Sequence, residues 1–205
     1  DQQYESALKT CKQGSSYELD YNASCATIGL KQYDTSFSLL KQAEAKCRAA
    51  GEQDGLDEQE IENDLTAITV QTACVKQLTG DVDGALQIYN EILSRKKTSD
   101  DVARVVAMNN SLAIHSLRKD DESKKSLFDV EKKLKLATQD KVKDKLTTQQ
   151  KTGLDLNLTL LYIQMNKLSE ARSKIQLIAQ QMPSDSQIPV ILESALLLKE
   201  KKPKE

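Results

Sequence analysis

The side chains with the most reactive chemistry in this 205-residue chain are four cysteines and one histidine. Thiolates and imidazoles are the usual zinc ligands, and they also form the nucleophile and base of cysteine enzymes. Here the cysteines stand 14, 22 and 27 residues apart, without a Cys-x-x-Cys pair, and no glycine-rich phosphate loop accompanies them. We therefore expect no metal, no cofactor and no enzyme activity, and we expect the thiols to be reduced packing residues. The residues concerned are Cys11, Cys25, Cys47, Cys74 and His115.

A short pattern of small and bulky apolar residues indicates how two helices would be placed against each other. Gly80 precedes the small Ala85 by five residues, Tyr89 follows four residues later, and Ile92 follows three after that. A turn glycine, a small residue at a helix crossing and bulky apolar residues beyond it are typical of the second helix of a tetratricopeptide repeat. Such repeats bind other proteins and do not catalyse reactions.

The pattern recurs at two other places. Ala171 takes the crossing position within residues 166–183, and Ser36 takes it in a weaker copy at 17–50. Because one helix pair cannot bury its apolar face alone, three copies predict stacked neighbours and a concave surface lined by the first helices. Ile175 and Ile178 follow Ala171 by four and seven residues, and Pro183 ends that copy. Leu40 and Ala43 follow Ser36 at the same two distances.

The whole chain is expected to be helical, because it holds only seven glycines and three prolines among many good helix formers. We predict an all-α fold, a tetratricopeptide-repeat-like helical solenoid with one irregular repeat, forming a single domain over 1–205. The chain ends on a first helix without its second, so we also expect a fragment of a longer protein. The predicted repeats lie near 17–50, 66–99, 100–145 (degenerate) and 152–185, with a partial fifth at 186–199.

Two segments interrupt the repeats. The second helix of the first repeat is predicted to end near residue 49, before an insertion at 51–64 with two glycines, seven carboxylates and no base. Its later part, Glu58 to Leu65, can extend the following helix. A solvated loop is one interpretation of the acidic run, and an acidic docking patch is the alternative. Residues 118–145 are rich in lysines and acids, and we expect an irregular helix and a loop there.

Charge narrows the class of partner. With 29 basic and 31 acidic residues, the net charge of −2 gives no attraction to phosphate backbones, and the absence of Trp removes a stacking platform for bases. No run of eighteen apolar residues occurs, and the N-terminus lacks the layout of a signal peptide. We expect a cytoplasmic protein that binds protein, without membrane insertion.

Seven residues on the predicted first helices are candidates for a partner-binding groove. Cys25 and Cys74 occupy the same position in their repeats, on the side of the helix that would border the groove. Burial of apolar side chains would drive capture of a peptide or a partner helix, and side-chain amides would fix its orientation. Plain packing against the next repeat is the alternative for each residue. The candidates are Tyr21, Asn22, Cys25 and Ile28 of the first repeat and Val70, Cys74 and Gln77 of the second.

Longer stretches resemble one protein family. Residues 21–29 (YNASCATIG), 39–48 (LLKQAEAKCR) and 84–92 (GALQIYNEI), in that order, are similar to the middle tetratricopeptide-repeat segment of the 72-kilodalton protein of the signal recognition particle. The resemblance spans residues 17 to about 198. Its specificity lies in the irregular parts, which generic repeats would not share: the acidic insertion, and Phe128-Asp129 with Lys132-Lys133 and Lys135-Leu136 between the third and fourth repeats.

This resemblance implies a non-catalytic scaffold. The family pairs with the 68-kilodalton protein of the same particle and takes a segment of it into the curved repeat surface. The heterodimer helps the particle to slow translation and to deliver ribosomes to the endoplasmic reticulum. RNA contact in the family belongs to a lysine-rich, tryptophan-containing region beyond the repeats, which this chain does not match. Association with the particle's RNA and with the ribosome would therefore be indirect.

A generic tetratricopeptide adaptor that binds a peptide or a chaperone tail is the alternative function. Adaptors of the chaperone type grip a C-terminal carboxylate with lysine, asparagine and arginine from two adjacent repeats. The equivalent positions here supply Asn22 and otherwise alanine, valine and cysteine. The sequence therefore predicts an incomplete clamp.

Overall fold

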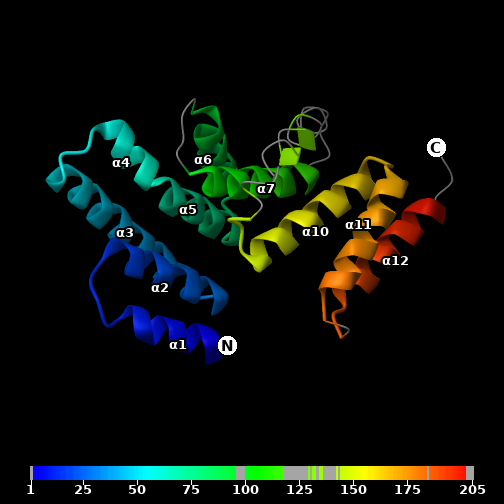
Figure 1. Ribbon diagram of the computed structural model, residues 1–205, viewed down its shortest axis with the longest axis horizontal. Helices are drawn as coiled ribbons and strands as arrows, with labels where there is room; N and C mark the ends of the chain where they lie inside the picture. The colour runs from blue at the N-terminus through cyan, green and yellow to red at the C-terminus, as the bar shows by residue number, and fades with distance from the viewer. Residues whose placement is uncertain are drawn as a thin grey trace. The chain divides into compact units, whose positions relative to one another are not determined.

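The computed structural model describes residues 2–95, 100–117, 129, 131–132, 134–135, 142, 144–183 and 185–201, and within these residues it contains helices and no strand (Figure 1). The chain divides into two compact units, Asp1–Ser111 and Leu112–Glu205. The predicted all-α class, a tetratricopeptide-repeat-like helical solenoid, is confirmed. A single repeat domain over residues 1–205 stays a prediction.

The first unit is built from two helical hairpins. Helix α2 (Tyr17–Gly29) packs against α3 (Tyr33–Gln53), and α5 (Thr66–Leu78) packs against α6 (Val82–Ser94). The hairpins stack because α3 also packs against α5, and the first helices α2 and α5 touch. Helix α1 (Gln2–Cys11) packs against α2, and α4 (Glu58–Asp64) packs against α3 and α5. Helix α7 (Asp101–Leu117) also begins in this unit.

The second unit contains a further hairpin and a helix that covers it. Helix α10 (Thr148–Gln164) packs against α11 (Leu168–Gln181), and α12 (Ile188–Lys201) packs against both. Its core includes Tyr162, Ile175 and Leu192, so α12 buries one face as the first helix of a next repeat would. The backbone N–H of Ile188 donates to Ser186 Oγ at 3.4 Å, just before α12 begins.

All three hairpins turn through one residue in the left-handed region of φ. The residue's N–H donates to the carbonyl three positions back, and the next N–H donates to the carbonyl five positions back, which satisfies the last carbonyls of the first helix. A fully buried small residue, the predicted crossing residue, follows five positions later. The turn and crossing residues are Lys31 (φ 60) with Ser36, Gly80 (φ 95) with Ala85, and Asn166 (φ 60) with Ala171.

The opposite side of each crossing is also small. Seven positions before the turn residue stand Ser24, Ala73 and Thr159, each 0% exposed. Small residues on both helices allow the two backbones to approach closely. The bulky residues predicted to follow the crossing are buried as well, and Tyr89 and Ile92 are 0% exposed. The predicted repeat register is therefore confirmed in all three hairpins.

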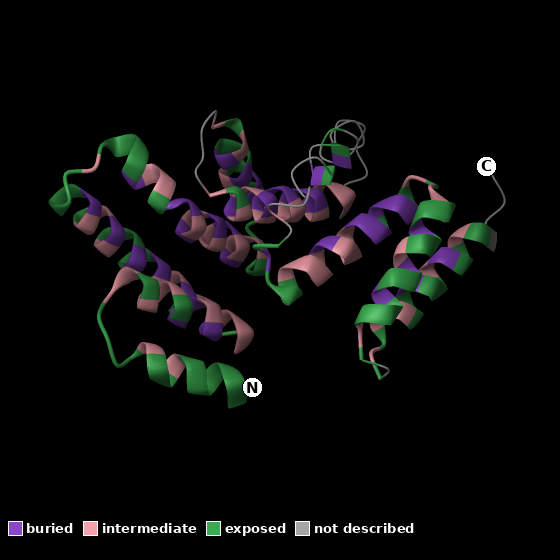
Figure 2. Ribbon diagram, in the orientation of Figure 1, coloured by how far each residue is buried: buried purple, intermediate pink, exposed green. Residues whose placement is uncertain are grey.

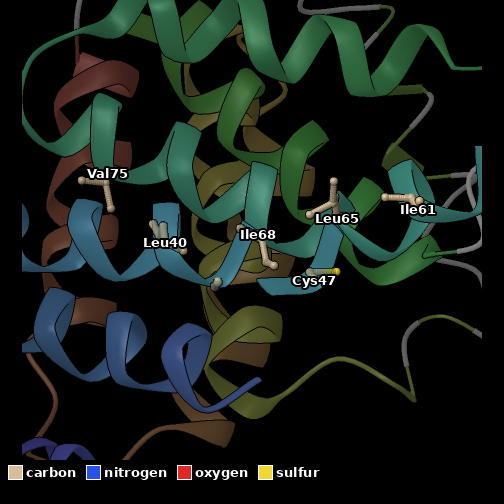
Figure 3. Close-up of a cluster of buried hydrophobic side chains, with 7 residues drawn as sticks. Leu40, Cys47, Ile61, Leu65, Ile68 and Val75 are labelled. Carbon is tan, nitrogen blue, oxygen red and sulfur yellow. The ribbon is translucent and has the colours of Figure 1, made fainter. Parts of the chain in front are cut away.

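One core cluster of the first unit lies between α3, α4 and α5. It also contains Cys47, which is 4% exposed and packs as a small apolar side chain (Figure 3). Burial raises the pKa of the Cys47 thiol, which disfavours the reactive thiolate. The full cluster is Leu40, Ala43, Cys47, Ile61, Leu65, Ile68 and Val75.

The prediction that a loop begins at residue 51 was wrong. Helix α3 continues to Gln53, and Gly51 is buried within it. A Cβ built on Gly51 would lie 2.7 Å from Ile61 Cγ1, so the glycine allows α4 to approach α3 and does not end the helix. The residues expected to extend the next helix form the separate helix α4, which begins with a capping box between Asp57 and Glu60.

The acidic run of this segment is paired in part within the chain. Glu62 accepts from Arg48 at 2.8 Å and from Arg95 at 2.9 Å, and Arg48 also donates to Glu58 at 2.8 Å. These ion pairs join α3, α4 and the end of α6. Two of the seven carboxylates between residues 51 and 64, Glu58 and Glu62, therefore link the helices of the first unit.

Most of the region predicted to be irregular, 118–145, lies outside the described residues. Two of its described side chains are buried, Glu131 at 4% exposed and Leu134 at 0%. Glu131 accepts from Lys135 at 2.7 Å and from Lys167 at 2.8 Å. This carboxylate thus connects its own segment to the turn between α10 and α11.

The N-terminal helix α1 is exposed along most of its length (Figure 2). It packs against α2, where the Tyr4 ring occupies the space that a Cβ on Gly29 would take, 2.6 Å from Tyr4 Cζ. Among the helices of the described residues, none combines the length and apolarity that a membrane crossing requires.

Candidate protein-binding face

The predicted site residues lie on the first helices α2 and α5, which touch. Cys25 is half-buried on α2, and Cys74 is half-buried on α5. Burial raises the pKa of Tyr21 and of Cys25, and Cys74 on the other helix raises both pKa values further. The name α2–α5 face is used below for six of the predicted residues: Tyr21, Asn22, Cys25, Ile28, Cys74 and Gln77.

The predicted residues differ in how much surface they offer. Asn22 is exposed, whereas Tyr21 and Ile28 are half-buried against the core cluster of α3, α4 and α5. Val70 is 3% exposed and belongs to the core. For Val70 the packing interpretation therefore fits, and the α2–α5 face excludes it.

The α2–α5 face is electrically neutral. Burial raises the pKa of Tyr21 and of the Cys25 and Cys74 thiols, so all three side chains are uncharged at neutral pH. A thiol held in its neutral form is a poor nucleophile and a poor metal ligand. The face can therefore offer apolar contact and amide hydrogen bonds to a ligand, and it offers no cation to a carboxylate.

Sequence analysis missed the support beneath Gln77. The Asn110 Nδ2 group donates to Tyr89 Oη at 3.1 Å, and Tyr89 Oη donates to Gln77 Oε1 at 3.3 Å. This chain of hydrogen bonds joins α7, α6 and α5 below the face. A signal for it was available, because a tyrosine predicted as a fully buried anchor needs a partner for its hydroxyl.

The same register identifies matching positions in the second unit, which sequence analysis also missed. Cys25 and Cys74 stand six residues before their left-handed turn residues, and Leu160 stands six residues before Asn166. Leu160 is 42% exposed on α10. The second unit thus presents an apolar side chain at the position where the first unit presents thiols.

The sequence is similar to curated proteins over most of its length, although no family model matches it. It is 34% identical over 191 residues to signal recognition particle subunit SRP72 of Canis lupus familiaris and 33% identical to that of Homo sapiens. Both matches cover 92% of this chain but 27% of the relative. The SRP72 of Dictyostelium discoideum is 29% identical over 202 residues, which cover 93% of this chain and 30% of that protein. The resemblance to the 72-kilodalton protein is confirmed, and the chain corresponds to a segment of these longer relatives.

Proposed function

From the similarity of this chain to a segment of the 72-kilodalton subunit of the signal recognition particle, we propose that it is a non-catalytic scaffold of that particle. It acts in the cytoplasm, in cotranslational targeting to the endoplasmic reticulum, by assembling with the 68-kilodalton protein of the particle. Its association with the particle's RNA and with the ribosome is indirect. The chain forms one repeat domain of a longer protein.

One observation carries this proposal: the match to SRP72 proteins covers 92% of the chain. It therefore includes the segments between the repeats, where a generic repeat protein would diverge. The stacked hairpins and the half-buried first helices of the first unit support a binding role.

A segment of the 68-kilodalton protein binds against the α2–α5 face. The half-buried Tyr21, Cys25, Ile28 and Cys74 lose their remaining contact with water, which contributes about 25 cal/mol for each Å² of apolar surface removed. The exposed amide of Asn22 contributes orientation. Because the face is neutral, the affinity depends only weakly on salt.

Isothermal titration calorimetry of the 205-residue chain with the 68-kilodalton protein tests this function. Asn22→Arg adds a charge and bulk at an exposed position of the face, so it should weaken binding by about tenfold, the effect of 1.4 kcal/mol, without lowering stability. Gln87→Arg is the matched control, because Gln87 is exposed on the second helix α6.

Three outcomes would decide. Weaker binding by Asn22→Arg alone supports the proposal, and equal affinities of both variants would remove the α2–α5 face from the site. Binding of a peptide ending in Glu-Glu-Val-Asp in place of the 68-kilodalton protein would favour a chaperone-tail adaptor.

A further inference from the structure

Gln77 is an unusual residue for its place in the repeat. It stands three positions before the left-handed turn residue Gly80, and the same position holds Ile28 and Ile163 in the other two hairpins. Partial burial of a polar side chain at this otherwise apolar position costs free energy unless its polar atoms are paired.

The carbonyl oxygen of the Gln77 amide is hydrogen-bonded by the buried Tyr89. Tyr89 is 0% exposed, and its hydroxyl group has a single proton. Because Asn110 Nδ2 can only donate, Tyr89 Oη accepts from Asn110 at 3.1 Å and uses its own proton for Gln77 Oε1 at 3.3 Å. In this arrangement Gln77 turns its carbonyl oxygen, and not its NH₂ group, toward Tyr89.

The other half of the amide remains available. Once Oε1 is held by Tyr89, the NH₂ group of Gln77 points away from that hydroxyl. In the described part of the chain, Gln77 Nε2 donates to no protein group, and it is not enclosed as a buried orphan atom. Gln77 is half-buried, one helical turn from Cys74. Its NH₂ group is thus a donor that a ligand on the surface of α5 can use.

We infer that Gln77 is a specificity-determining residue of the α2–α5 face, where its oriented NH₂ group donates a hydrogen bond to a main-chain carbonyl of the bound segment. Tyr89 and Asn110 are positioning residues that act through it. This inference rests on the proposed function. The ligand it describes is a stretch of the 68-kilodalton protein with apolar side chains and an unpaired carbonyl, because the face carries no charge that would select a charged ligand.

The test compares an amide-to-acid change at Gln77 with the same change nearby. Gln77→Glu keeps an oxygen that accepts from Tyr89 but replaces the NH₂ donor with an acceptor, which repels a carbonyl. Binding of the 68-kilodalton protein, measured by calorimetry, should weaken by about tenfold with the thermal unfolding midpoint unchanged. Gln87→Glu is the control, because Gln87 is exposed on the neighbouring second helix α6. It introduces the same charge and should weaken binding by less than about threefold.

A spectroscopic readout separates positioning from packing. In ¹⁵N-labelled protein, addition of the 68-kilodalton protein should shift the side-chain NH₂ signals of Gln77, and Tyr89→Phe should shift them in the free chain. Unshifted Gln77 signals on binding, or equal losses of affinity for Gln77→Glu and Gln87→Glu, would overturn this inference alone. If the unaltered chain did not bind the 68-kilodalton protein, the proposed function would be contradicted, and this inference would fall with it.

Discussion

Ser24 Oγ lies 3.0 Å from Ser36 Oγ, and both side chains are fully buried where α2 crosses α3. Ser36 Oγ also lies 3.3 Å from the Ser24 carbonyl oxygen. The corresponding crossing in the second hairpin is made by Ala73 and Ala85, which have no polar atoms to satisfy. In the first hairpin, a hydrogen-bonded pair of small residues therefore fills the crossing that two alanines fill in the second.

This pair should show energetic coupling. Ser36→Ala leaves the buried Ser24 hydroxyl without its side-chain partner and should lower the free energy of unfolding by about 1 kcal/mol. The double variant Ser24→Ala/Ser36→Ala removes both polar groups, so it should be no less stable than Ser36→Ala. A double-mutant cycle in urea measures the coupling, and additive single effects would contradict it.

The left-handed turn residues predict a gain in stability. Lys31 and Asn166 are exposed and adopt φ 60, so replacing Lys31 with glycine relieves the steric cost of its Cβ. Lys31→Gly should raise the free energy of unfolding by about 0.5 to 1 kcal/mol, and Asn166→Gly by less, because asparagine tolerates this region better. Lys31→Ala is the control, since it removes the side chain but keeps the Cβ. A gain in Lys31→Ala equal to that in Lys31→Gly would refute the backbone explanation.

Enlarging a crossing residue should separate the helices. Ala85→Leu places a branched side chain at a 0% exposed contact between α5 and α6, and overpacking of this kind costs about 1 to 3 kcal/mol. Gln87→Leu makes a similar apolar change on the exposed side of α6 and should alter stability by less than about 0.5 kcal/mol. Guanidinium unfolding of both variants gives the comparison, and similar losses would show that Ala85 is not a close contact.

Acid should weaken the contact made by Glu131. Burial by itself raises the pKa of this carboxyl, but hydrogen bonds from Lys135 and Lys167 outweigh it and hold that pKa below its ordinary value of 4.5. A carboxyl with a lowered folded-state pKa stabilises the fold above its unfolded-state pKa, and that contribution is lost as the pH falls through the folded value.

Stability should therefore fall below about pH 4.5 by more in the unaltered chain than in Glu131→Gln, which has no carboxyl to protonate. Thermal unfolding midpoints of the two proteins, measured at a series of pH values, should converge as the pH decreases. Parallel curves for the two proteins would show that Glu131 contributes nothing to the acid dependence.

The repeat register could be predicted because it depends on local residue types. Ala85, Ala171 and Ser36 are small at a fixed distance from bulky apolar residues, and this spacing follows from helix geometry alone. The left-handed turns were only partly predictable. A glycine such as Gly80 indicates a left-handed turn in the sequence. Lys31 and Asn166 adopt the same left-handed conformation because their hairpins impose it.

Features that depend on contacts between distant segments were missed or misjudged. Gly51 resembles a helix terminator in the sequence, yet it is buried against Ile61 from another helix. The burial of Val70 and the support of Gln77 by Asn110 also depend on helices that lie far apart in the sequence. No periodicity within one helix contains this information.

Protection of native thiols by the partner tests whether the 68-kilodalton protein binds the α2–α5 face. Cys25 and Cys74 are half-buried on the α2–α5 face, so iodoacetamide should label them slowly in the free chain, and the rates can be followed by mass spectrometry. With saturating 68-kilodalton protein, labelling of both thiols should slow by about tenfold or more. A control cysteine introduced by Gln87→Cys on α6 should react at an unchanged rate. Equal labelling of Cys25 and Cys74 with and without bound partner would contradict it.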